Sequence, residues 1–258
     1  MKFFDTHAHC DDKRFESEYE GGTLGVINDC LSSNVSYIIN IGTDLNNSRA
    51  SIELAEKFEN VYASCGIHPS EVFYEDADSA VAEIEKMLKH PKAVALGEIG
   101  LDYHYENTDK AKQMEYFERQ MLLAEKLGLP VCIHDRDSHA DVMEVIRRHP
   151  NVRGILHSFS GSVEMALELV KLGYYISFSG TLTFTNARKP REVAAALPQD
   201  KVLIETDCPY LTPHPHRGKI NHSGYLAYTN ATLASIFGVS EEECARITEE
   251  NARRILGI

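Results

Sequence analysis

Short runs of apolar residues alternate along the chain with longer stretches in which apolar residues recur every three or four positions. The short runs have the length of strands, and the longer stretches have the period of amphipathic helices. Eight runs are predicted to be strands: Phe3–His9, Tyr37–Gly42, Val61–His68, Ala93–Leu101, Val131–Asp135, Arg153–Ser158, Tyr174–Ser179 and Val202–Asp207. The stretches predicted to be helices are Ser48–Phe58, Ala77–Lys89, Asp109–Leu127, Ala140–Arg148, Val163–Leu172, Asn230–Phe237 and Glu241–Leu256.

This alternation of strands and helices predicts an α/β fold with a parallel sheet. Eight strands favour a closed TIM-type (β/α)8 barrel, which uses about 250 residues as one domain. The chain is therefore expected to form a single barrel domain over residues 1–258. A doubly wound open sheet is the alternative, because one miscounted strand would remove the reason for closure. Ser240 with Glu243 has the spacing of a capping box, and Gly128 and Gly173 follow two predicted helices.

Composition narrows the class of protein. The formal net charge of −13 argues against a broad basic surface for nucleic acid, but it is compatible with a small, locally positive site. None of the six cysteines forms a C-x-x-C pair, which favours free thiols in a reducing compartment over disulfides or a zinc knuckle. Neither an apolar run of transmembrane length nor a secretory leader is visible, so we expect a cytoplasmic protein with no membrane contact and no obligatory protein partner.

Histidines and acidic residues gather near the ends of the predicted strands. In a (β/α)8 barrel the catalytic residues come from the carboxyl ends of the strands. The residues with metal-binding side chains at these positions are His7, His9, His68, Glu98, His134, His157, Glu205 and Asp207. A random scatter of the 12 histidines would not place five of them there. The joint arrangement therefore predicts a metal site at the barrel mouth.

Spacing within the strands supports this interpretation. Residues two apart on a strand point to the same face, so His7 and His9 are predicted to face the barrel mouth together, as are Glu205 and Asp207. Imidazoles with carboxylates suit Zn, Mn, Fe or Ni, and the acidic positions also accept Mg. The set is larger than one ion needs, so two divalent ions are expected, and Glu98 is the candidate bridge.

The remaining histidines and one cysteine have less specific interpretations. A lone histidine in a strand is more often a core residue than a ligand, and for His68 alone the two interpretations are evenly balanced. We expect solvated side chains for the histidines that fall in helices or loops: His90, His104, His139 and His149. Cys132, two residues before His134, is expected to fill the core one layer deeper.

A long loop follows the last predicted strand, and its prolines stiffen it. Arg217 offers a planar fork of donors suited to phosphate, and Lys219 and Asn221 add donors nearby. Arg136, two residues after His134, is a weaker candidate of the same kind. The alternative is a solvated loop whose arginine pairs only with a local acid. We favour contact with substrate, because the loop follows a ligand-bearing strand.

Taken together, several segments resemble the TatD family of metal-dependent deoxyribonucleases, within the amidohydrolase-like metal hydrolases. The matching segments are Asp5–His9 with Asp11, Gly66–Pro69, Gly97–Tyr103, Ile133–Asp137, His157–Gly161 and Glu205–Asn221. They cover the whole chain, and their combination is specific, although the first motif is shared with many amidohydrolases. Two positions depart from many members, since Ser158 replaces Cys and Asp135 replaces Ser, which affects fine specificity.

The resemblance implies a barrel that holds two divalent ions (Mg, Mn or Zn). His7, His9 and Asp207 would hold one ion, His134 and His157 would hold the other, and Glu98 would bridge them. The residues expected to contact substrate are His68, Arg136, Glu205, Arg217 and Asn221. The activity implied for the family is hydrolysis of DNA phosphodiester bonds, often as a 3′→5′ exonuclease, so DNA is the expected partner.

The ligand set leads to a hypothesis for the mechanism. Water held by two metal ions would lose a proton near neutral pH, with Asp207 as a ligand that can also accept the proton. The hydroxide would attack phosphorus in line, while the metals and Arg217 offset the growing charge. The rival enzyme is a small-molecule amidohydrolase, such as a lactonase or deaminase. Against it stand Glu98, where several relatives use a modified lysine, and the Arg217–Asn221 loop. The rival of another class, a non-catalytic nucleic-acid or metal-binding module, fits the net charge poorly.

Overall fold

Strand β1 (Phe3–Ala8) has no exposed residue, as is expected for a strand covered on both faces. It pairs in parallel with β2 (Val35–Ile41), and the register places Phe3 opposite Val35 and Ala8 opposite Asn40. The longest strand, β4 (Ala93–Asp102), is likewise buried along all ten residues. These buried strands explain why the sequence shows continuous apolar runs rather than a strict alternation.

The structure is a computed structural model that describes residues 1–73 and 76–258. Within these residues eight strands have the order β1 to β8 and alternate with helices. This topology defines the (β/α)8 barrel class, as predicted from the sequence. All eight predicted strands are present.

The chain divides into two compact units. Unit 1 comprises Met1–Asn40, His157–Lys171 and Tyr175–Ile258, and unit 2 comprises Ile41–Leu156 and Leu172–Tyr174. Strands β1, β7 and β8 belong to unit 1, and strands β3 to β6 belong to unit 2.

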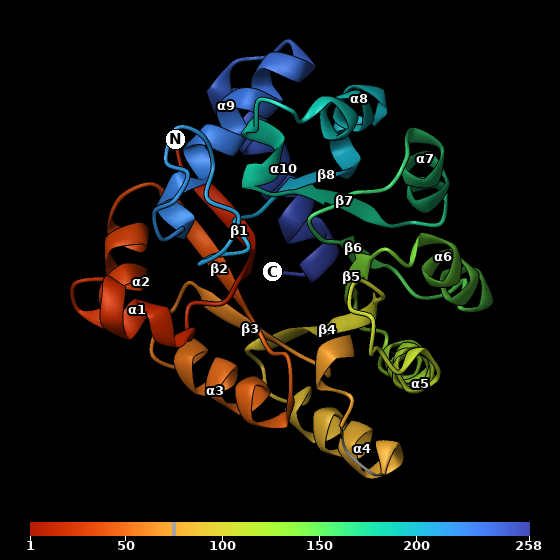
Figure 1. Cartoon of the computed structure of the whole chain (residues 1–258). Helices are drawn as coiled ribbons and strands as arrows, with labels where there is room; N and C mark the ends of the chain where they lie inside the picture. Colours follow the sequence, from red (N-terminus) through yellow and green to blue (C-terminus); the bar gives the residue numbers. More distant parts are fainter. Residues whose placement is uncertain (74–75) are drawn as a thin grey trace. The chain divides into compact units, whose positions relative to one another are not determined.

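In unit 1 the C-terminal helices cover strands from both ends of the chain. Strand β7 pairs in parallel with β8, and α10 packs against β1, β8 and α9, which Figure 1 shows in blue beside it. The Oγ of Ser240 accepts a hydrogen bond from the backbone N–H of Glu243 at 3.1 Å, which caps α10 as its sequence predicts. The elements of unit 1 other than β1 and β2 are α1 (Lys13–Glu18), α2 (Gly22–Ser32), α7 (Val163–Lys171), β7 (Tyr175–Phe178), η2 (Gly180–Thr183), α8 (Arg188–Ala196), η3 (Gln199–Lys201), β8 (Val202–Ile204), η4 (Ser223–Tyr225), α9 (Leu226–Phe237) and α10 (Glu241–Leu256).

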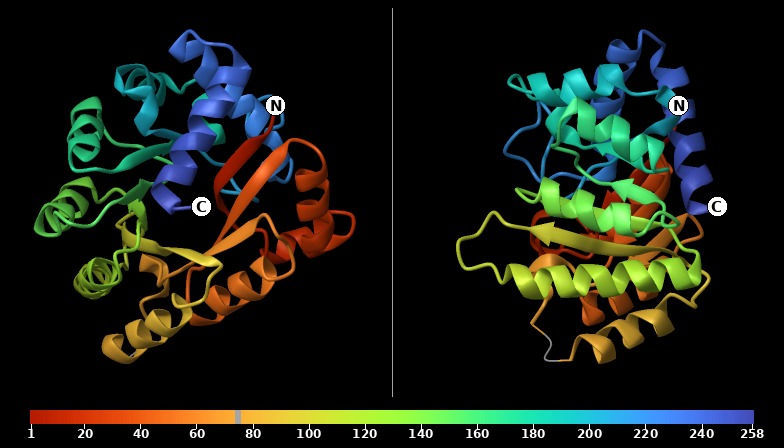
Figure 2. Two further views of the ribbon diagram at one scale, coloured as in Figure 1. Left: turned by 180° about the vertical axis from the view of Figure 1, so that it is seen from behind. Right: turned by 90° about the vertical axis from the view of Figure 1, so that its right-hand side faces the viewer.

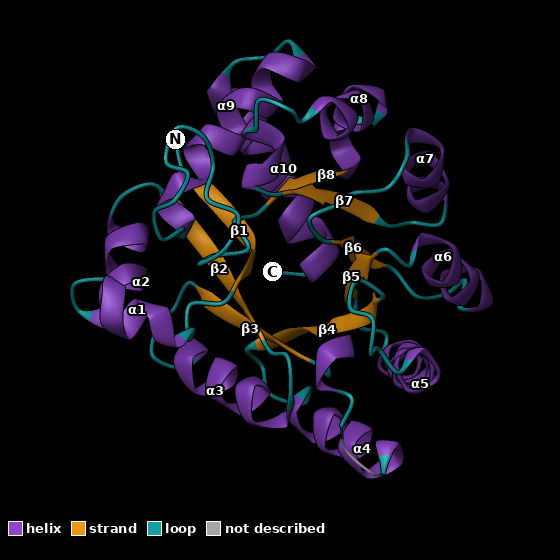
Figure 3. Ribbon diagram, in the orientation of Figure 1, coloured by secondary structure: helices purple, strands orange, loops and turns teal. Residues whose placement is uncertain are grey.

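Unit 2 is a run of parallel strands with helices between them (Figure 3). The longest helix, α5, packs along β4, as the side view in Figure 2 shows, and ends at Gly128 in the left-handed conformation that the sequence predicts. The register of β4 and β5 places Gly100 opposite His134. The elements of unit 2 other than β4 are α3 (Leu45–Ala55), β3 (Val61–Cys65), η1 (Pro69–Glu71), α4 (Ala77–Met87), α5 (Lys110–Leu127), β5 (Val131–Arg136), α6 (His139–Arg148) and β6 (Gly154–Leu156).

The cysteines and one histidine differ in how well the sequence predicts their surroundings. All six cysteines are free and buried, Cys132 among them. The prediction that His149 is solvated is wrong: the side chain is buried, and its Nε2 lies 2.8 Å from Glu118 Oε2. Within the described residues, no helix is both long enough and apolar enough to cross a membrane.

Candidate metal centre

Most candidate ligands lie near the carboxyl ends of strands or just beyond them, whereas Glu98 lies inside β4. His7 lies in β1, and His9 follows the end of that strand directly. The prediction that Glu205 and Asp207 share one face of a strand is wrong, because β8 ends at Ile204. Asp207 instead has φ 56°, so the chain turns sharply after the strand. The two carboxylates take their directions from this turn rather than from strand pleating.

The first group of ligands, here called the unit-1 cluster, consists of His7, His9, His157, Glu205 and Asp207. His7 Nε2 and His9 Nε2 lie 3.2 Å apart, so both histidines point to one place, as their spacing predicts. Asp207 Oδ1 lies 3.4 Å from the Nε2 of His9 and 3.6 Å from that of His7. The ring of His157 stacks on that of His7, with centroids 4.0 Å apart.

Glu205 is the most deeply buried carboxylate of the unit-1 cluster. Its Oε1 accepts a hydrogen bond from the backbone N–H of Ser158 at 2.7 Å and lies 3.3 Å from His157 Nδ1. Its Oε2 is buried and makes no hydrogen bond to any described residue. Ligand atoms of Glu205, His7 and His157 all lie within 4.8 Å of one another. Since an unsatisfied buried carboxylate oxygen is costly, a cation at this place would relieve the cost.

Backbone contacts tie β1 to the turn that carries Asp207. The N–H of Asp207 donates to the carbonyl of His7 at 2.9 Å, and the N–H of His9 donates to the carbonyl of Cys208 at 2.8 Å. Asp207 and Ser158 (φ 41°) both adopt the left-handed conformation. This conformation costs free energy for residues other than glycine and persists where surrounding contacts impose it, often at functional sites.

Asp5 supports the backbone around the unit-1 cluster. It is not among the site residues predicted from the sequence. It is fully buried and accepts hydrogen bonds from the Oγ1 and N–H of Thr206, at 2.6 and 3.0 Å, and from the N–H of His7 at 3.3 Å. Burial raises the pKa of Asp5 to about 7, against the lowering effect of these hydrogen bonds. Asp5 therefore fixes the backbone on both sides of the cluster.

The charge state of Asp207 follows from its neighbours. Burial alone would raise the pKa of this carboxyl group. The hydrogen bond to His9 and the charges of His7 and His157 outweigh burial, so the pKa of Asp207 falls below its usual value. Asp207 is therefore a carboxylate at neutral pH, which is the form that binds a cation.

The second group of ligands, here called the unit-2 cluster, consists of His68, Glu98 and His134. Glu98 Oε1 lies 2.9 Å from His134 Nδ1 and 3.6 Å from His68 Nε2. One ligand atom from each of the three residues lies within 4.8 Å of the others. His68 was expected to contact substrate, but it lies with the candidate ligands, because its Nδ1 is used by Ser70 and its Nε2 faces Glu98.

Asp102 is a further residue that sequence reasoning missed. Its Oδ2 lies 3.3 Å from His134 Nε2, on the ring nitrogen opposite the one that faces Glu98. Burial would raise the pKa of Asp102, but its hydrogen bonds to His134 and to the N–H of His104 lower it overall. A carboxylate behind a ligating histidine fixes the tautomer and orientation of the imidazole.

The residues predicted to contact substrate fall into two groups. Arg217 and Arg136 are exposed; Arg217 stacks on Phe184, with Cζ 4.1 Å from the ring centroid. Asn221 is fully buried, and its Nδ2 donates to the carbonyls of Thr206 and Tyr210 at 3.0 and 2.6 Å. We therefore reassign Asn221 from substrate contact to support of the loop. Glu205, also predicted to contact substrate, is buried among the candidate ligands as described above.

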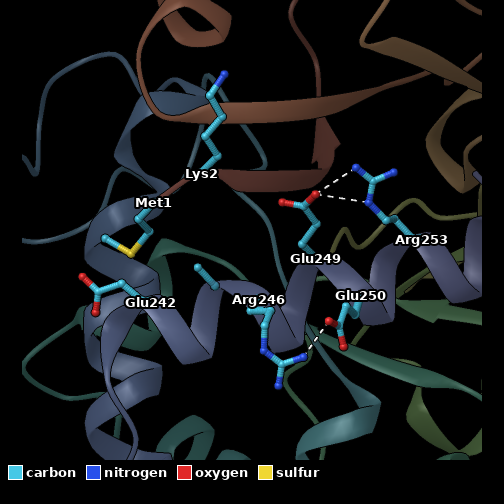
Figure 4. A pocket seen from close by; sticks show the side chains of 8 residues that line it. Met1, Lys2, Glu242, Arg246, Glu249, Glu250 and Arg253 are labelled. Carbon is cyan, nitrogen blue, oxygen red and sulfur yellow. Dashed lines mark hydrogen bonds and ion pairs between the residues drawn. The ribbon is translucent and has the colours of Figure 1, made fainter.

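The two clusters fit divalent ions by the chemistry of their donors. Each combines imidazole nitrogens with carboxylate oxygens, a mixed set that accepts Zn or Mn, and Mg where carboxylates dominate. A different pocket of about 420 Å³ lies beside α10 in unit 1 (Figure 4). Four of its lining charges form two ion pairs, since Arg253 contacts Glu249 at 2.9 Å and Arg246 contacts Glu250 at 2.6 Å. Because no histidine lines it, this pocket is not a candidate for the metal chemistry.

Comparisons with known proteins identify one family over nearly the whole chain. A family model described as TatD related DNase matches residues 4–257. The chain is 40% identical over 257 residues to the uncharacterized metal-dependent hydrolase YabD of Bacillus subtilis, covering 99% of each chain. It is 35% identical to the uncharacterized metal-dependent hydrolase YcfH of Escherichia coli, covering 100% of this chain and 97% of that one. The crystal structure of YJJV, a TatD homolog from Escherichia coli, matches with a TM-score of 0.91 and 30% identity, over 99% of this chain and 98% of that chain.

The fold, the ligand clusters and these relatives define a metal-dependent hydrolase built on a (β/α)8 barrel. Within that class, the chain belongs to the TatD family.

Proposed function

We propose that this protein is a deoxyribonuclease that hydrolyses phosphodiester bonds of DNA with two divalent ions, in the 3′→5′ direction. The observation that carries the hydrolytic part is the unit-1 cluster, in which Asp207 and Glu205 stand among three histidines. The DNA substrate is supported by membership of a family described as TatD related DNase.

The proposed ligand assignment follows the family resemblance and the contacts within each unit. His7, His9 and Asp207 hold one ion, and His134 and His157 contribute to the other, with Glu98 as the shared carboxylate. Two residues are added because of their positions: Glu205, which shares a ligand group with His157, and His68, which faces Glu98. Donors of this kind favour Mg, Mn or Zn.

A divalent ion bound at these residues would lower the pKa of a water that it coordinates and would polarise the phosphoryl oxygens. Asp207 accepts the proton released by the attacking water at its carboxylate. Glu205 and Glu98 hold their histidine partners in place. Arg217 and Arg136, both exposed, direct their guanidinium groups to the phosphates of the substrate.

The proposal is tested by digestion of end-labelled single-stranded DNA after chelation, with Mg, Mn, Zn or Co added back singly. We expect no cleavage by the chelated protein, restored cleavage with at least one ion, and a ladder that shortens from the 3′ end. A ladder that shortens from the 5′ end would reverse the proposed direction of digestion and leave the rest of the proposal unchanged. Hydrolysis of lactones or amides without any attack on DNA would replace the nuclease with a small-molecule amidohydrolase. The matched variants are His7→Gln, expected to be inactive, and His90→Gln, at a partly exposed histidine outside both clusters, expected to be active.

A further inference from the structure

Tyr210 is a large aromatic side chain that stays on the surface beside the candidate ligands. It is 48% exposed and lies three residues after Asp207. Its backbone is held on both sides: its N–H donates to the carbonyl of Asp207 at 2.9 Å, and its carbonyl accepts from Asn221 Nδ2 at 2.6 Å. The ring is therefore presented from a fixed backbone rather than from a free loop tip.

The ring of Tyr210 lies between a histidine ligand and an arginine. The edge of the ring meets His9, with centroids 6.4 Å apart and planes at 81°. The guanidinium of Arg14 stacks over the ring, with Cζ 4.1 Å from the centroid. Asp12 holds both partners, since its Oδ2 accepts from Tyr210 Oη at 3.3 Å and from Arg14 Nη2 at 2.9 Å.

The contacts around Tyr210 fix the positions of the ring and of the guanidinium group. Arg14 makes a forked contact with Asp12, through Nε at 3.0 Å and Nη2 at 2.9 Å, so the guanidinium plane is fixed against the ring. Stacked aromatic rings and arginine planes are the groups that bind the faces of nucleobases, and this binding tolerates all four bases because each has a π-face. Little rotamer freedom remains to be lost when a base is bound.

Building on the proposed nuclease function, we propose that Tyr210, backed by Arg14, is the platform that stacks the nucleobase next to the phosphate being cleaved. Its place beside His9 sets the distance between a bound base and the metal ligands. Tyr210 is then a substrate-binding residue that determines preference for base-bearing substrates and carries no proton in the reaction.

The test compares two oligonucleotides, one with normal bases and one with abasic tetrahydrofuran residues in place of the nucleotides at the cleaved end. The enzyme is assayed with the metal that supports the wild-type reaction. Stacking on one aromatic side chain corresponds to about a 10- to 100-fold preference, so the wild type is expected to favour the base-bearing strand by that ratio in kcat/KM. In Tyr210→Ala the preference falls to about twofold, mainly through KM, while Tyr210→Phe keeps it.

Further variants separate stacking from loss of structure. Tyr228→Ala removes another exposed tyrosine of unit 1 and is expected to keep the wild-type preference. Tyr210→Leu keeps the apolar volume of the side chain but has no π-face. It replaces Tyr210→Ala in the test if the alanine variant unfolds. It is expected to lose the preference for the base-bearing strand. Arg14→Gln is expected to raise KM by a smaller factor than Tyr210→Ala.

The failures of the two proposals are distinguishable. A wild-type enzyme that cleaves DNA but treats both oligonucleotides equally, or folded Tyr210→Ala and Tyr210→Leu variants that keep the preference, would overturn the stacking platform and leave the nuclease intact. A wild-type protein that neither cleaves nor binds the oligonucleotides with any added ion would overturn the nuclease and this inference with it.

Discussion

The two ligand clusters use the same kinds of side chain but differ in how many carboxylates they contain. In the unit-1 cluster Glu205 and Asp207 stand among three histidines, whereas in the unit-2 cluster Glu98 alone stands between two. The unit-1 cluster therefore supplies one carboxylate to each proposed ion, Asp207 to the first and Glu205 to the second, and the unit-2 cluster supplies the shared Glu98. Attraction between unlike charges at contact distance is strong in a partly buried site, so loss of any of these three carboxylates should weaken ion binding.

The clusters also differ in the contacts that fix their shape. Asp5 near the start of the chain bonds to Thr206, so the unit-1 cluster depends on contacts between distant parts of the sequence. The unit-2 cluster depends on neighbouring strands, since Glu98 and Asp102 lie on β4 and His134 lies on β5. The comparison indicates that unit 1 supplies charge to hold an ion, and unit 2 supplies one carboxylate whose histidine partners are oriented locally.

The largest expected effect is that of Asp207→Asn. The amide cannot accept the proton and carries no charge, so turnover should fall by about 100- to 10,000-fold, as is usual on loss of a general base. The control is Asp137→Asn, because Asp137 is also in the left-handed conformation, at φ 57° against 56° for Asp207. Steady-state cleavage of single-stranded DNA measures both. Wild-type turnover in Asp207→Asn would remove that residue from the mechanism.

Next in size is the effect of Glu98→Gln in unit 2. Loss of a group that hydrogen-bonds to a metal ligand lowers metal affinity or activity by about 10- to 100-fold. Loss of a direct ligand should therefore lower turnover by about 100-fold or more. The variant should keep the fold and bind one ion instead of two, as counted by equilibrium dialysis. Glu56→Gln, at an exposed carboxylate, is the control. A Glu98→Gln enzyme that still binds two ions would show that Glu98 is not a shared ligand.

A smaller effect is expected from Asp102→Asn, which tests whether unit 2 orients its histidine locally. Asp102 acts through His134, so ion affinity should weaken by about 10- to 100-fold with the unfolding temperature little changed. Calorimetric titration of the chelated protein with Zn measures this affinity without relying on turnover. Asp102→Glu should restore part of the affinity. If the ion affinity of Asp102→Asn is unchanged, Asp102 does not orient His134, and Glu98 is sufficient to do so.

The smallest effect concerns acid stability and comes from His222, a largely buried histidine of unit 1. Burial first, and the charge of His216 second, lower the pKa of His222 from 6.5 to about 4. As pH falls below 6.5, the unfolded chain takes up a proton that the folded chain refuses until about pH 4, so stability is lost across this window. The loss is up to about 3 kcal/mol. Denaturant titrations of His222→Asn between pH 7 and pH 4 should show a shallower decline than the wild type, and an equal slope would contradict this account.

The sequence was sufficient to predict the strands and most helices, because continuous apolar runs and helical periods are local signals. It did not predict α1, α2 and α8. Helix α1 has only six residues, α2 contains Gly22 and Gly25, and α8 carries Pro190 in its first turn. Each feature weakens the local signal for a helix that tertiary packing then stabilises.

The candidate ligands were also predictable, since histidines and acids near strand ends are visible in the sequence. The supporting residues were not, because their roles depend on contacts across the chain. Asp5 bonds to Thr206 across 201 positions, and Asn221 is buried although its loop looked solvent-facing. Asp207 points toward His7 and His9 as predicted, but the sharp turn that gives it this direction was not predictable, because a positive φ is not encoded in strand periodicity.

The most direct test of the central claim counts the ions bound per chain and relates the count to DNA cleavage. Chelated protein is dialysed against increasing Mn or Zn, bound metal is measured by mass spectrometry, and cleavage of single-stranded DNA is measured on the same samples. The account predicts no cleavage without metal, binding of two ions per chain, and full activity only when both ions are bound. Full cleavage by the metal-free protein, or by protein that holds a single ion, would contradict it.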